Sequence, residues 1–177
     1  MQQPSQTNVD TASIAQVEAC LPVLLDSILG TYFDAERATR LLSDAAERSS
    51  LFVATQGGEL VGFYVVADPG VFLVFPYLHL LAVKTSERSK GIGAALIAHF
   101  EQQSRNNGDY PFRRKVFLLV AEHNQRALAF YVRSGYKQMA RIPDMFGEGD
   151  TELLMMKDLG PKPATHIPAQ QPTTQQS

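Results

Sequence analysis

The sequence predicts a mixed α/β domain in which about four helices flank a central mixed β-sheet. Two amphipathic helical patterns open the chain, a predicted β-hairpin follows, and two strand–helix units come next. Two further strand-like runs close the folded part. A helix with one apolar stripe needs another layer to cover that stripe, and a sheet supplies such a layer. The order of the elements therefore favours one sheet covered by helices.

The first two elements are predicted helices. Apolar residues recur at helical spacing from Val17 to Ile28, and Pro22 is expected to start or kink this helix. A second apolar stripe runs from Ala38 to Ala45. Before these helices, residues 6–11 are the only candidate for an initial strand.

A hairpin is expected to begin the main part of the sheet. Two apolar runs, 51–55 and 60–67, flank Gly57-Gly58, which is a strong turn signal. The Asp-Pro-Gly sequence at 68–70 is expected to turn the chain again. The remaining strands are expected at residues 78–83, 116–120, 136–142 and 151–157.

Length and composition indicate one domain, which we expect to span residues 13–159 of the 177-residue chain. Residues 1–12 are expected to be disordered or to form a weak first strand. Residues 160–177 are rich in Pro, Gln and Thr. Because this segment has little apolar surface to offset the entropy of ordering, we expect it to be a disordered tail.

Charge and cysteine content exclude several classes of protein. The chain has 16 basic and 18 acidic residues, a balance that argues against a nucleic-acid-binding protein. It has no run of 18 apolar residues, so no membrane association is expected. The single cysteine, Cys20, cannot form an intramolecular disulfide and is expected to be a small buried residue. The N-terminus lacks the pattern of a signal peptide, so the cytoplasm is the expected location.

A basic, glycine-rich segment links the strand at 78–83 to an apolar helical pattern. It reads Arg88-Ser-Lys-Gly91-Ile-Gly93. Glycines without a Cβ let backbone and ligand approach closely, and the free N–H groups of a helix's first turn attract an anion. The spacing matches neither the P-loop nor the dinucleotide-binding fingerprint. The segment alone fits either a phosphate site or a tight strand–helix connection.

A second segment follows the strand at 116–120. It begins at Asn124, a good helix N-cap, and ends at Gly135, a good residue to follow a helix. Ala127, Phe130 and Tyr131 fall on one helical face between them. A short capped helix with an aromatic core face would explain Phe130, but this interpretation does not require Tyr131.

Together the two segments resemble the GNAT superfamily of acyl-coenzyme A-dependent N-acyltransferases. Arg88-x-x-Gly91-x-Gly93 is similar to the family's coenzyme A signature, and Asn124 to Tyr136 is similar to its second motif. The resemblance covers roughly residues 51–157. It implies a splayed sheet, acetyl-CoA as the cosubstrate, and transfer of the acetyl group to a primary amine of a small molecule or protein by direct attack in a ternary complex.

The resemblance also implies where coenzyme A would lie. The pyrophosphate would sit on backbone N–H groups of residues 89–94, and the pantetheine would pair with the strand edge at 81–83. Arg88 and Lys90 would add positive charge. The predicted coenzyme A contacts are Leu81, Ala82, Val83, Arg88, Ser89, Lys90, Gly91, Ile92, Gly93, Ala94, Asn124, Ala127, Phe130 and Tyr131.

Three residues are candidates for proton transfer. Tyr131 would act as the general acid, because a phenol can protonate the thiolate that leaves. A base must deprotonate the amine. Some family members use a Glu in the strand before the second motif, where this chain has Leu119. His79 and Glu122 are the remaining candidates, and a water chain without a dedicated base is an equal alternative.

The sequence leaves the acceptor open. It is expected to contact the first two helices and the loop at 141–150. The four histidines have no ligand-like spacing with carboxylates or with Cys20, so no metal is expected. The expected partners are acetyl-CoA and an amine acceptor, and the protein is expected to be a monomer or homodimer. A catalytically silent acyl-CoA-binding or sensor domain is the alternative function.

Overall fold

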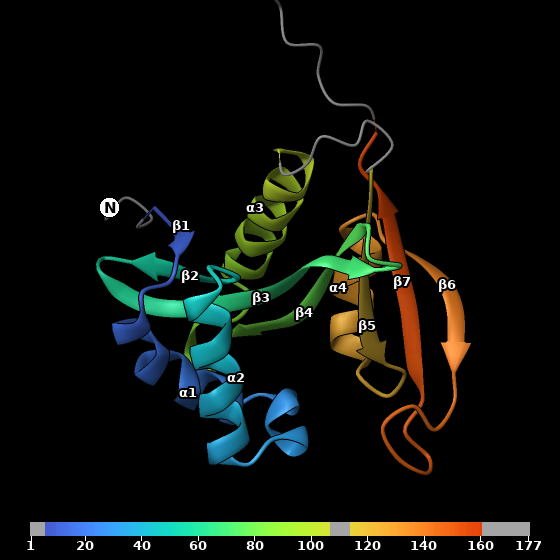
Figure 1. Ribbon diagram of the computed structural model, residues 1–177, viewed down its shortest axis with the longest axis horizontal. Coiled ribbons are helices and arrows are strands. Elements are labelled where there is room, and N and C mark those ends of the chain that lie inside the picture. The colour runs from blue at the N-terminus through green and yellow to red at the C-terminus, as the bar shows by residue number, and fades with distance from the viewer. Residues whose placement is uncertain (1–5, 107–113, 161–177) are drawn as a thin grey trace, which may run out of the picture.

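The computed structural model describes residues 6–106 and 114–160, and it shows a seven-stranded mixed sheet with helices on both faces (Figure 1). The fold class predicted from the sequence is confirmed. The strand order is β1-β2-β3-β4-β5-β7-β6, and only β4 and β5 run parallel. The strands are β1 (Asn8–Thr11), β2 (Leu51–Gln56), β3 (Glu59–Val71), β4 (Phe75–Val83), β5 (Lys115–Ala121), β6 (Lys137–Ile142) and β7 (Glu152–Asp158).

Four α-helices lie in the described part of the chain. They are α1 (Val17–Leu25), α2 (Ala35–Glu47), α3 (Ile92–Asn106) and α4 (Gln125–Arg133), and short 3₁₀ turns occur at Ile14–Gln16 (η1), Ile28–Tyr32 (η2) and Thr85–Glu87 (η3). The weak initial strand is present as β1. The tail predicted at 160–177 lies outside the described residues from position 161 onwards.

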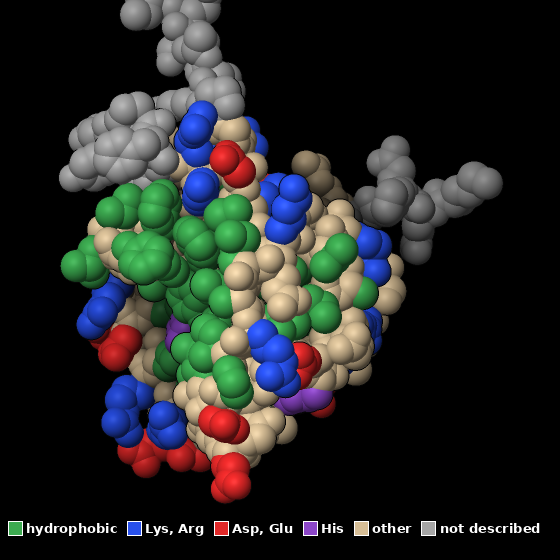
Figure 2. Space-filling model, turned by 90° about the vertical axis from the view of Figure 1, so that its right-hand side faces the viewer, with side chains coloured by type: hydrophobic (Ala, Val, Ile, Leu, Met, Phe, Trp, Pro, Cys, Tyr) green, Lys and Arg blue, Asp and Glu red, His purple; other side chains and the backbone are tan. Residues whose placement is uncertain are grey.

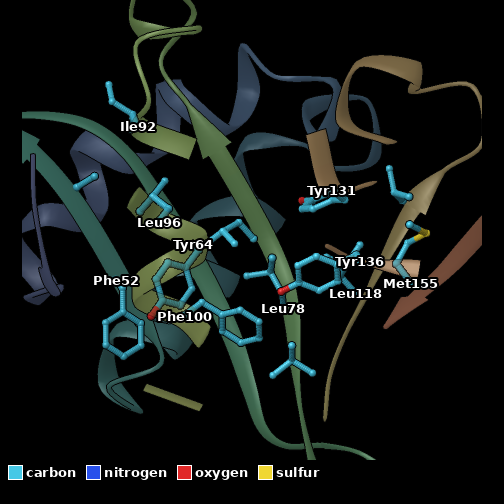
Figure 3. Close-up of a cluster of buried hydrophobic side chains, with 14 of the residues drawn as sticks. Phe52, Tyr64, Leu78, Ile92, Leu96, Phe100, Leu118, Tyr131, Tyr136 and Met155 are labelled. Atoms are coloured by element: carbon cyan, nitrogen blue, oxygen red, sulfur yellow. The ribbon is translucent and has the colours of Figure 1, made fainter. Parts of the chain in front are cut away.

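Two hydrophobic clusters lie on the two faces of the sheet. One joins α1 and α2 to the inward side chains of β2, β3 and β4, with Leu24, Leu42 and Phe63 fully buried. The other joins α3 and α4 to the opposite face, and Figure 3 shows its aromatic members. In that view Tyr131 and Tyr136 lie on one side of β4, and Tyr64 and Phe52 lie on the other. Cys20 is fully buried in the α1–α2 cluster, as predicted.

Local capping explains where the helices begin and end. Asp34 accepts a hydrogen bond from the Arg37 N–H at 2.8 Å and starts α2. The predicted first helix is too long, because α1 ends at Leu25 and Ile28 belongs to η2. The Ser27 hydroxyl donates to the Leu24 carbonyl at 2.7 Å and accepts from the Leu29 N–H at 3.1 Å, which turns the chain. Pro22 lies inside α1.

Asp68-Pro69-Gly70 does not turn the chain, contrary to the prediction. β3 continues to Val71 through an irregularity, and the reversal lies between Val71 and Phe75, which pair with each other. Cross-strand pairing with β4 thus overrides the local turn signal, and Pro69 is accommodated in an irregular stretch of the strand.

A β-bulge in β4 sets up the site. Val65 pairs with Leu80 and Val66 with Leu78, which leaves His79 as the extra residue. Leu78 therefore packs in the α3–α4 cluster, whereas Leu80 packs in the α1–α2 cluster. The bulge thus interrupts the alternation of side chains along β4.

The two parallel strands separate just beyond this bulge. β4 and β5 pair only at Tyr77↔Phe117 and Leu78↔Leu118. From His79 onwards β4 has no partner on its β5 side among the described residues. The carboxyl ends of β4 and β5 therefore leave a gap in the middle of the sheet, which is where ligands bind in many open α/β sheets.

Candidate active site

A cavity of about 450 Å³ occupies the gap between the separated ends of β4 and β5. The glycine turn and the start of α3 form one wall, α4 forms another, and η2 closes a third side. Most of the predicted coenzyme A contacts line this cavity. They are Leu81, Ala82, Val83, Arg88, Ser89, Gly91, Gly93, Ala94, Asn124, Ala127, Phe130 and Tyr131.

Two of the predicted contacts do not line the cavity. The Ile92 side chain is 1% exposed and belongs to the hydrophobic core. The Lys90 ammonium forms an ion pair with Glu87 at 3.0 Å. Arg126 is a cavity residue that the sequence did not indicate, and its guanidinium donates to the Ser89 hydroxyl at 3.3 Å.

The glycine turn presents free backbone groups to the cavity. Gly91 has φ +86°, and a Cβ built there would meet nothing within 4 Å. α3 begins immediately after it, so the N–H groups of its first turn have no acceptor within the helix. Arg88 stabilises the end of β4, because its Nε donates a hydrogen bond to the Val83 carbonyl at 3.2 Å. This arrangement can bind an anion through backbone N–H groups and the positive end of the helix dipole.

The second motif forms the opposite wall as a capped helix. The Asn124 carboxamide oxygen accepts from the Ala127 N–H at 3.1 Å and starts α4. Phe130 packs against the turn, and a Cβ on Gly93 would lie 3.4 Å from its ring. Gly93 therefore lets α3 and α4 approach each other closely.

Tyr131 of α4 also lines the cavity. Its side chain is 8% exposed, and its ring packs edge-on against the Tyr136 ring with 5.8 Å between centroids (Figure 3). Burial raises the pKa of Tyr131, and the neighbouring Tyr77 adds to the increase. The phenol therefore stays protonated at neutral pH and can donate a proton.

His79 stands between two cavities. It lines the cavity described above, and it also lines a second cavity of about 640 Å³ that runs beside α2. Three arginines of that second cavity, Arg37, Arg40 and Arg48, come from α2 or its end. Desolvation of the imidazole lowers the pKa of His79. The ring is therefore neutral and can accept a proton at neutral pH.

Glu122, the other candidate base, lies outside the cavity. Arg141 holds it through two hydrogen bonds of 2.7 Å each. These bonds and the positive charge of Arg141 lower the pKa of Glu122, and 40% of its side chain is exposed. The structure thus brings His79 and Tyr131 to the cavity and leaves Glu122 at the surface.

The loop predicted to contact the acceptor, residues 141–150, meets the η2 turn that lies between the first two helices. The Tyr32 ring of η2 packs edge-on against the Phe146 ring of the loop between β6 and β7, with 6.2 Å between centroids. Asp144 stabilises this loop by accepting from the Gly149 N–H at 2.7 Å. In Figure 2 a broad band of hydrophobic side chains covers the side of the molecule formed by the β5–β7–β6 half, with a histidine in a hollow beside it.

Glu152 is a buried acidic residue that the sequence analysis missed. It is 4% exposed, and burial raises the pKa of its carboxyl group. The one signal in the sequence was a single Glu within the apolar run Leu-Leu-Met-Met that follows it. A strand with one polar residue is common enough that this signal did not distinguish Glu152.

The described ranges contain neither a candidate membrane-spanning helix nor a candidate metal cluster. No helix within 6–106 and 114–160 has the length and apolar character to cross a membrane. No group of three or more His, Cys, Asp or Glu side chains in these same ranges is arranged to hold a metal ion. His99 is half-buried and hydrogen-bonded to the Tyr64 hydroxyl at 2.9 Å.

The chain matches a known protein family and many known structures. The model of the acetyltransferase (GNAT) family matches residues 19–136. No curated protein sequence matches the chain significantly. Similar solved structures include Ard1 from Thermoplasma volcanium, which has a TM-score of 0.72 and 22% identity over 86% of this chain and 97% of its own.

Two further similar structures contain a coenzyme. YncA from Salmonella typhimurium, a putative acetyltransferase solved with its cofactor acetyl-CoA, has a TM-score of 0.69 and 16% identity over 92% of this chain and 99% of its own. The PaiA N-acetyltransferase from Thermoplasma acidophilum, in complex with coenzyme A, has a TM-score of 0.67 and 21% identity over 86% of this chain and 99% of its own. At these identities the likeness concerns the fold.

Proposed function

Because this chain belongs to the acetyltransferase (GNAT) family, we propose that it transfers the acetyl group of acetyl-CoA to a primary amine by direct attack in a ternary complex. The observation that carries the proposal is the cavity between β4 and β5. It joins a helix N-terminus suited to phosphate, an unpaired strand edge, a protonated tyrosine and a neutral histidine.

Acetyl-CoA fits the coenzyme side of this cavity. The N–H groups at the start of α3 would hold the pyrophosphate, and Arg126 and Arg88 would add positive charge. The unpaired edge of β4 at 81–83 would hydrogen-bond the amide groups of pantetheine. The acetyl-CoA and coenzyme A complexes of YncA and PaiA, which share the fold, support this placement.

Two protons must leave the amine during the reaction. An alkylammonium group with a pKa of about 10.4 is less than roughly 0.1% neutral at pH 7, so a base in the site is needed. As the new C–N bond forms and the C–S bond breaks, His79 accepts a proton from the nitrogen. Tyr131 donates a proton to the departing sulfur. One proton ends on the thiol of coenzyme A and the other reaches solvent.

The cysteine supports direct attack over an acetyl-cysteine intermediate. The chain has one cysteine, Cys20, and it is fully buried on the α1–α2 face. Burial raises the pKa of its thiol to about 12, so it is not a thiolate at neutral pH. The amine therefore has to react with acetyl-CoA itself.

The body of the acceptor would lie on the α1–α2 side. The cavity beside α2 includes His79 in its lining, and the η2 and β6–β7 segments contact each other through Tyr32 and Phe146. These features fit a small molecule or a protein N-terminus that reaches the centre with its amine group.

The test is release of thiol from acetyl-CoA in the presence of n-butylamine, glycinamide, spermidine or a short peptide with a free N-terminus. We expect thiol release above the protein-free rate, together with an acetylated product detected by mass spectrometry. The buried Cys20 should not react with the thiol reagent. If acetyl-CoA binds and no amine accelerates thiol release, the protein is a silent acyl-CoA-binding domain.

A further inference from the structure

Glu152 is a buried carboxylate on the acceptor side of the sheet. It is the first residue of β7 and pairs with Ala121 of β5 and Ile142 of β6. Its neighbour Leu153 packs in the α3–α4 cluster, so the alternation of side chains directs Glu152 to the opposite face. That face is the one on which η2 lies. Glu152 therefore lies on the η2 side of the sheet, at the carboxyl end of β5.

The Glu152 carboxylate has no hydrogen-bond or ion-pair partner among the described residues. With 4% of its surface exposed, it is one of two buried polar residues in that part of the chain, and Ser104 is the other. The Tyr136 hydroxyl is the fully buried side-chain group without a partner in the described ranges, so the Glu152 carboxylate keeps some contact with solvent. A largely desolvated carboxylate that is still accessible can take a cationic ligand as its partner.

Aromatic rings and few charges surround this carboxylate. Tyr77 of β4 and Tyr32 of η2 are close enough that the negative charge of Glu152 helps to raise the pKa of both phenols. His123 and Asp150 also act on Glu152, and they oppose each other: His123 lowers its pKa and Asp150 raises it. No arginine or lysine acts on Glu152 within the described ranges.

Tyr77 of β4 lies between the surroundings of Glu152 and the proposed reaction centre. The Tyr77 ring lies 6.0 Å from the His79 ring, centroid to centroid, and His79 lines the coenzyme cavity. Tyr32, the other tyrosine near Glu152, contacts Phe146 with 6.2 Å between ring centroids. A carboxylate between aromatic faces is suited to an ammonium group, which gains both an ion pair and cation–π contacts.

We propose that Glu152 binds the ammonium group of the acceptor and takes its first proton, with Tyr32 and Tyr77 as the walls of the subsite. The inference rests on the proposed acetyl transfer and names the acceptor class, a primary amine that is protonated at neutral pH. The ammonium gives one proton to the carboxylate and becomes a neutral amine. His79 takes the second proton as the C–N bond forms, and Tyr131 protonates the sulfur.

A ligand-binding role has a consequence for stability. Because burial raises the pKa of Glu152 in the folded state, the folded protein binds this proton more tightly than the unfolded chain. The free energy of unfolding therefore falls as pH rises from the unfolded value, about 4.3, through the folded pKa. At neutral pH an unliganded Glu152 destabilises the fold, and Glu152→Gln relieves this cost.

The experiment compares wild type with Glu152→Gln, using n-butylamine and glycinamide as acceptors. We expect kcat/KM for n-butylamine to fall about 100-fold, the size of a general-base contribution. Glycinamide, whose amine resembles an α-amino group with a pKa of about 8, should lose less, because less of it needs deprotonation. The variant should bind acetyl-CoA like wild type and unfold at a higher temperature at neutral pH.

Glu101→Gln is the matched control. Glu101 is a partly buried carboxylate of α3, and Lys157 contacts both of its oxygens at 2.7 Å. Because Glu101 has its partner, its loss should lower the unfolding temperature and leave kcat/KM for both amines unchanged. The opposite stability effects of the two Glu→Gln changes separate a ligand-binding carboxylate from a structural one.

Three results would overturn the proposal. The first is that Glu152→Gln retains wild-type kcat/KM for n-butylamine. The second is that Glu152→Gln loses equal activity with both amines and unfolds at a lower temperature. In either case Glu152 would have no role or a structural one, and an active wild-type protein would leave the proposed acetyl transfer intact. A wild-type protein that binds acetyl-CoA and acetylates neither amine would overturn both proposals together.

Discussion

The two sides of the central cavity are built in different ways. The side proposed to bind the coenzyme is lined by two short continuous segments, within residues 81–94 and 124–131, and the proposed contacts are largely with the backbone. The proposed acceptor side consists of single side chains from distant parts of the chain: Tyr32, Tyr77, His79 and Glu152. A site formed by consecutive backbone groups can be recognised as a short motif in the sequence. A site assembled from side chains of distant elements has no such motif.

Tyr131 is the proposed general acid, and its loss should have the largest effect on kcat. We expect Tyr131→Phe to lower kcat by roughly 10²–10⁴-fold, the usual contribution of a general acid, and to leave acetyl-CoA affinity unchanged. Steady-state kinetics and calorimetry check the two parts. The control is Tyr64→Phe, which removes a hydroxyl bonded to His99 at 2.9 Å and should reduce stability without reducing kcat. An equal loss of kcat in both variants would remove Tyr131 from the chemistry.

A change at Gly91 should disable the coenzyme side alone. Gly91→Asp places a side chain and a negative charge where the phosphates would approach, and we expect acetyl-CoA affinity to fall at least about 100-fold. Gly58→Asp in the β2–β3 turn is a close control, because Gly58 has the same φ of +86° and equally open surroundings. Calorimetry should find normal affinity in the Gly58 variant. Similar losses in both variants would mean that backbone strain, and not the site, causes the effect.

The pH dependence of kcat tests the proposed acceptor side separately from the coenzyme side, because it reports on His79. The pKa of His79 is lowered by its surroundings, so the rising limb of kcat against pH should have its midpoint below 6.5. His79→Gln should lower kcat roughly 10–100-fold and shift or remove that limb, with acetyl-CoA affinity unchanged. An unaltered pH profile in the variant would favour a water chain in place of His79.

The smallest expected effects concern the charges around the coenzyme. Arg126 lines the cavity and contacts Ser89, whereas Lys90 is held by Glu87 outside it. We expect Arg126→Gln to weaken acetyl-CoA binding about tenfold, and Lys90→Gln to weaken it less than about threefold. Titrations at two salt concentrations check the order, and a larger effect at Lys90 would contradict the assignment.

The sequence predicted the layers of the fold because periodicity and caps act locally. Asn124 and Gly135 bound α4 as expected, and the glycine turn precedes α3. The β-bulge at His79 was not predicted, because it arises from the register between β3 and β4, which no single strand specifies. The continuation of β3 past Pro69 has the same cause.

The sequence predicted those cavity residues that belong to short motifs, and it missed those that the fold brings together from distant positions. Gly91, Asn124 and Tyr131 belong to motifs with fixed spacing, and all three line the cavity. The ion pair of Glu122 with Arg141 joins positions 19 residues apart and could not be anticipated. Glu152 reaches the acceptor side only because β7 inserts between β5 and β6. Such an insertion follows from the assembled sheet and not from the sequence around Glu152.

Calorimetric titration of the wild-type protein with acetyl-CoA, with free coenzyme A as the comparison, tests the central claim most directly. If the gap between β4 and β5 is a coenzyme site, both ligands should bind with affinities near the micromolar range, about −8 kcal/mol. Absence of binding heat for both ligands at millimolar concentration would contradict the account, because the chain would then have the fold without the cofactor site.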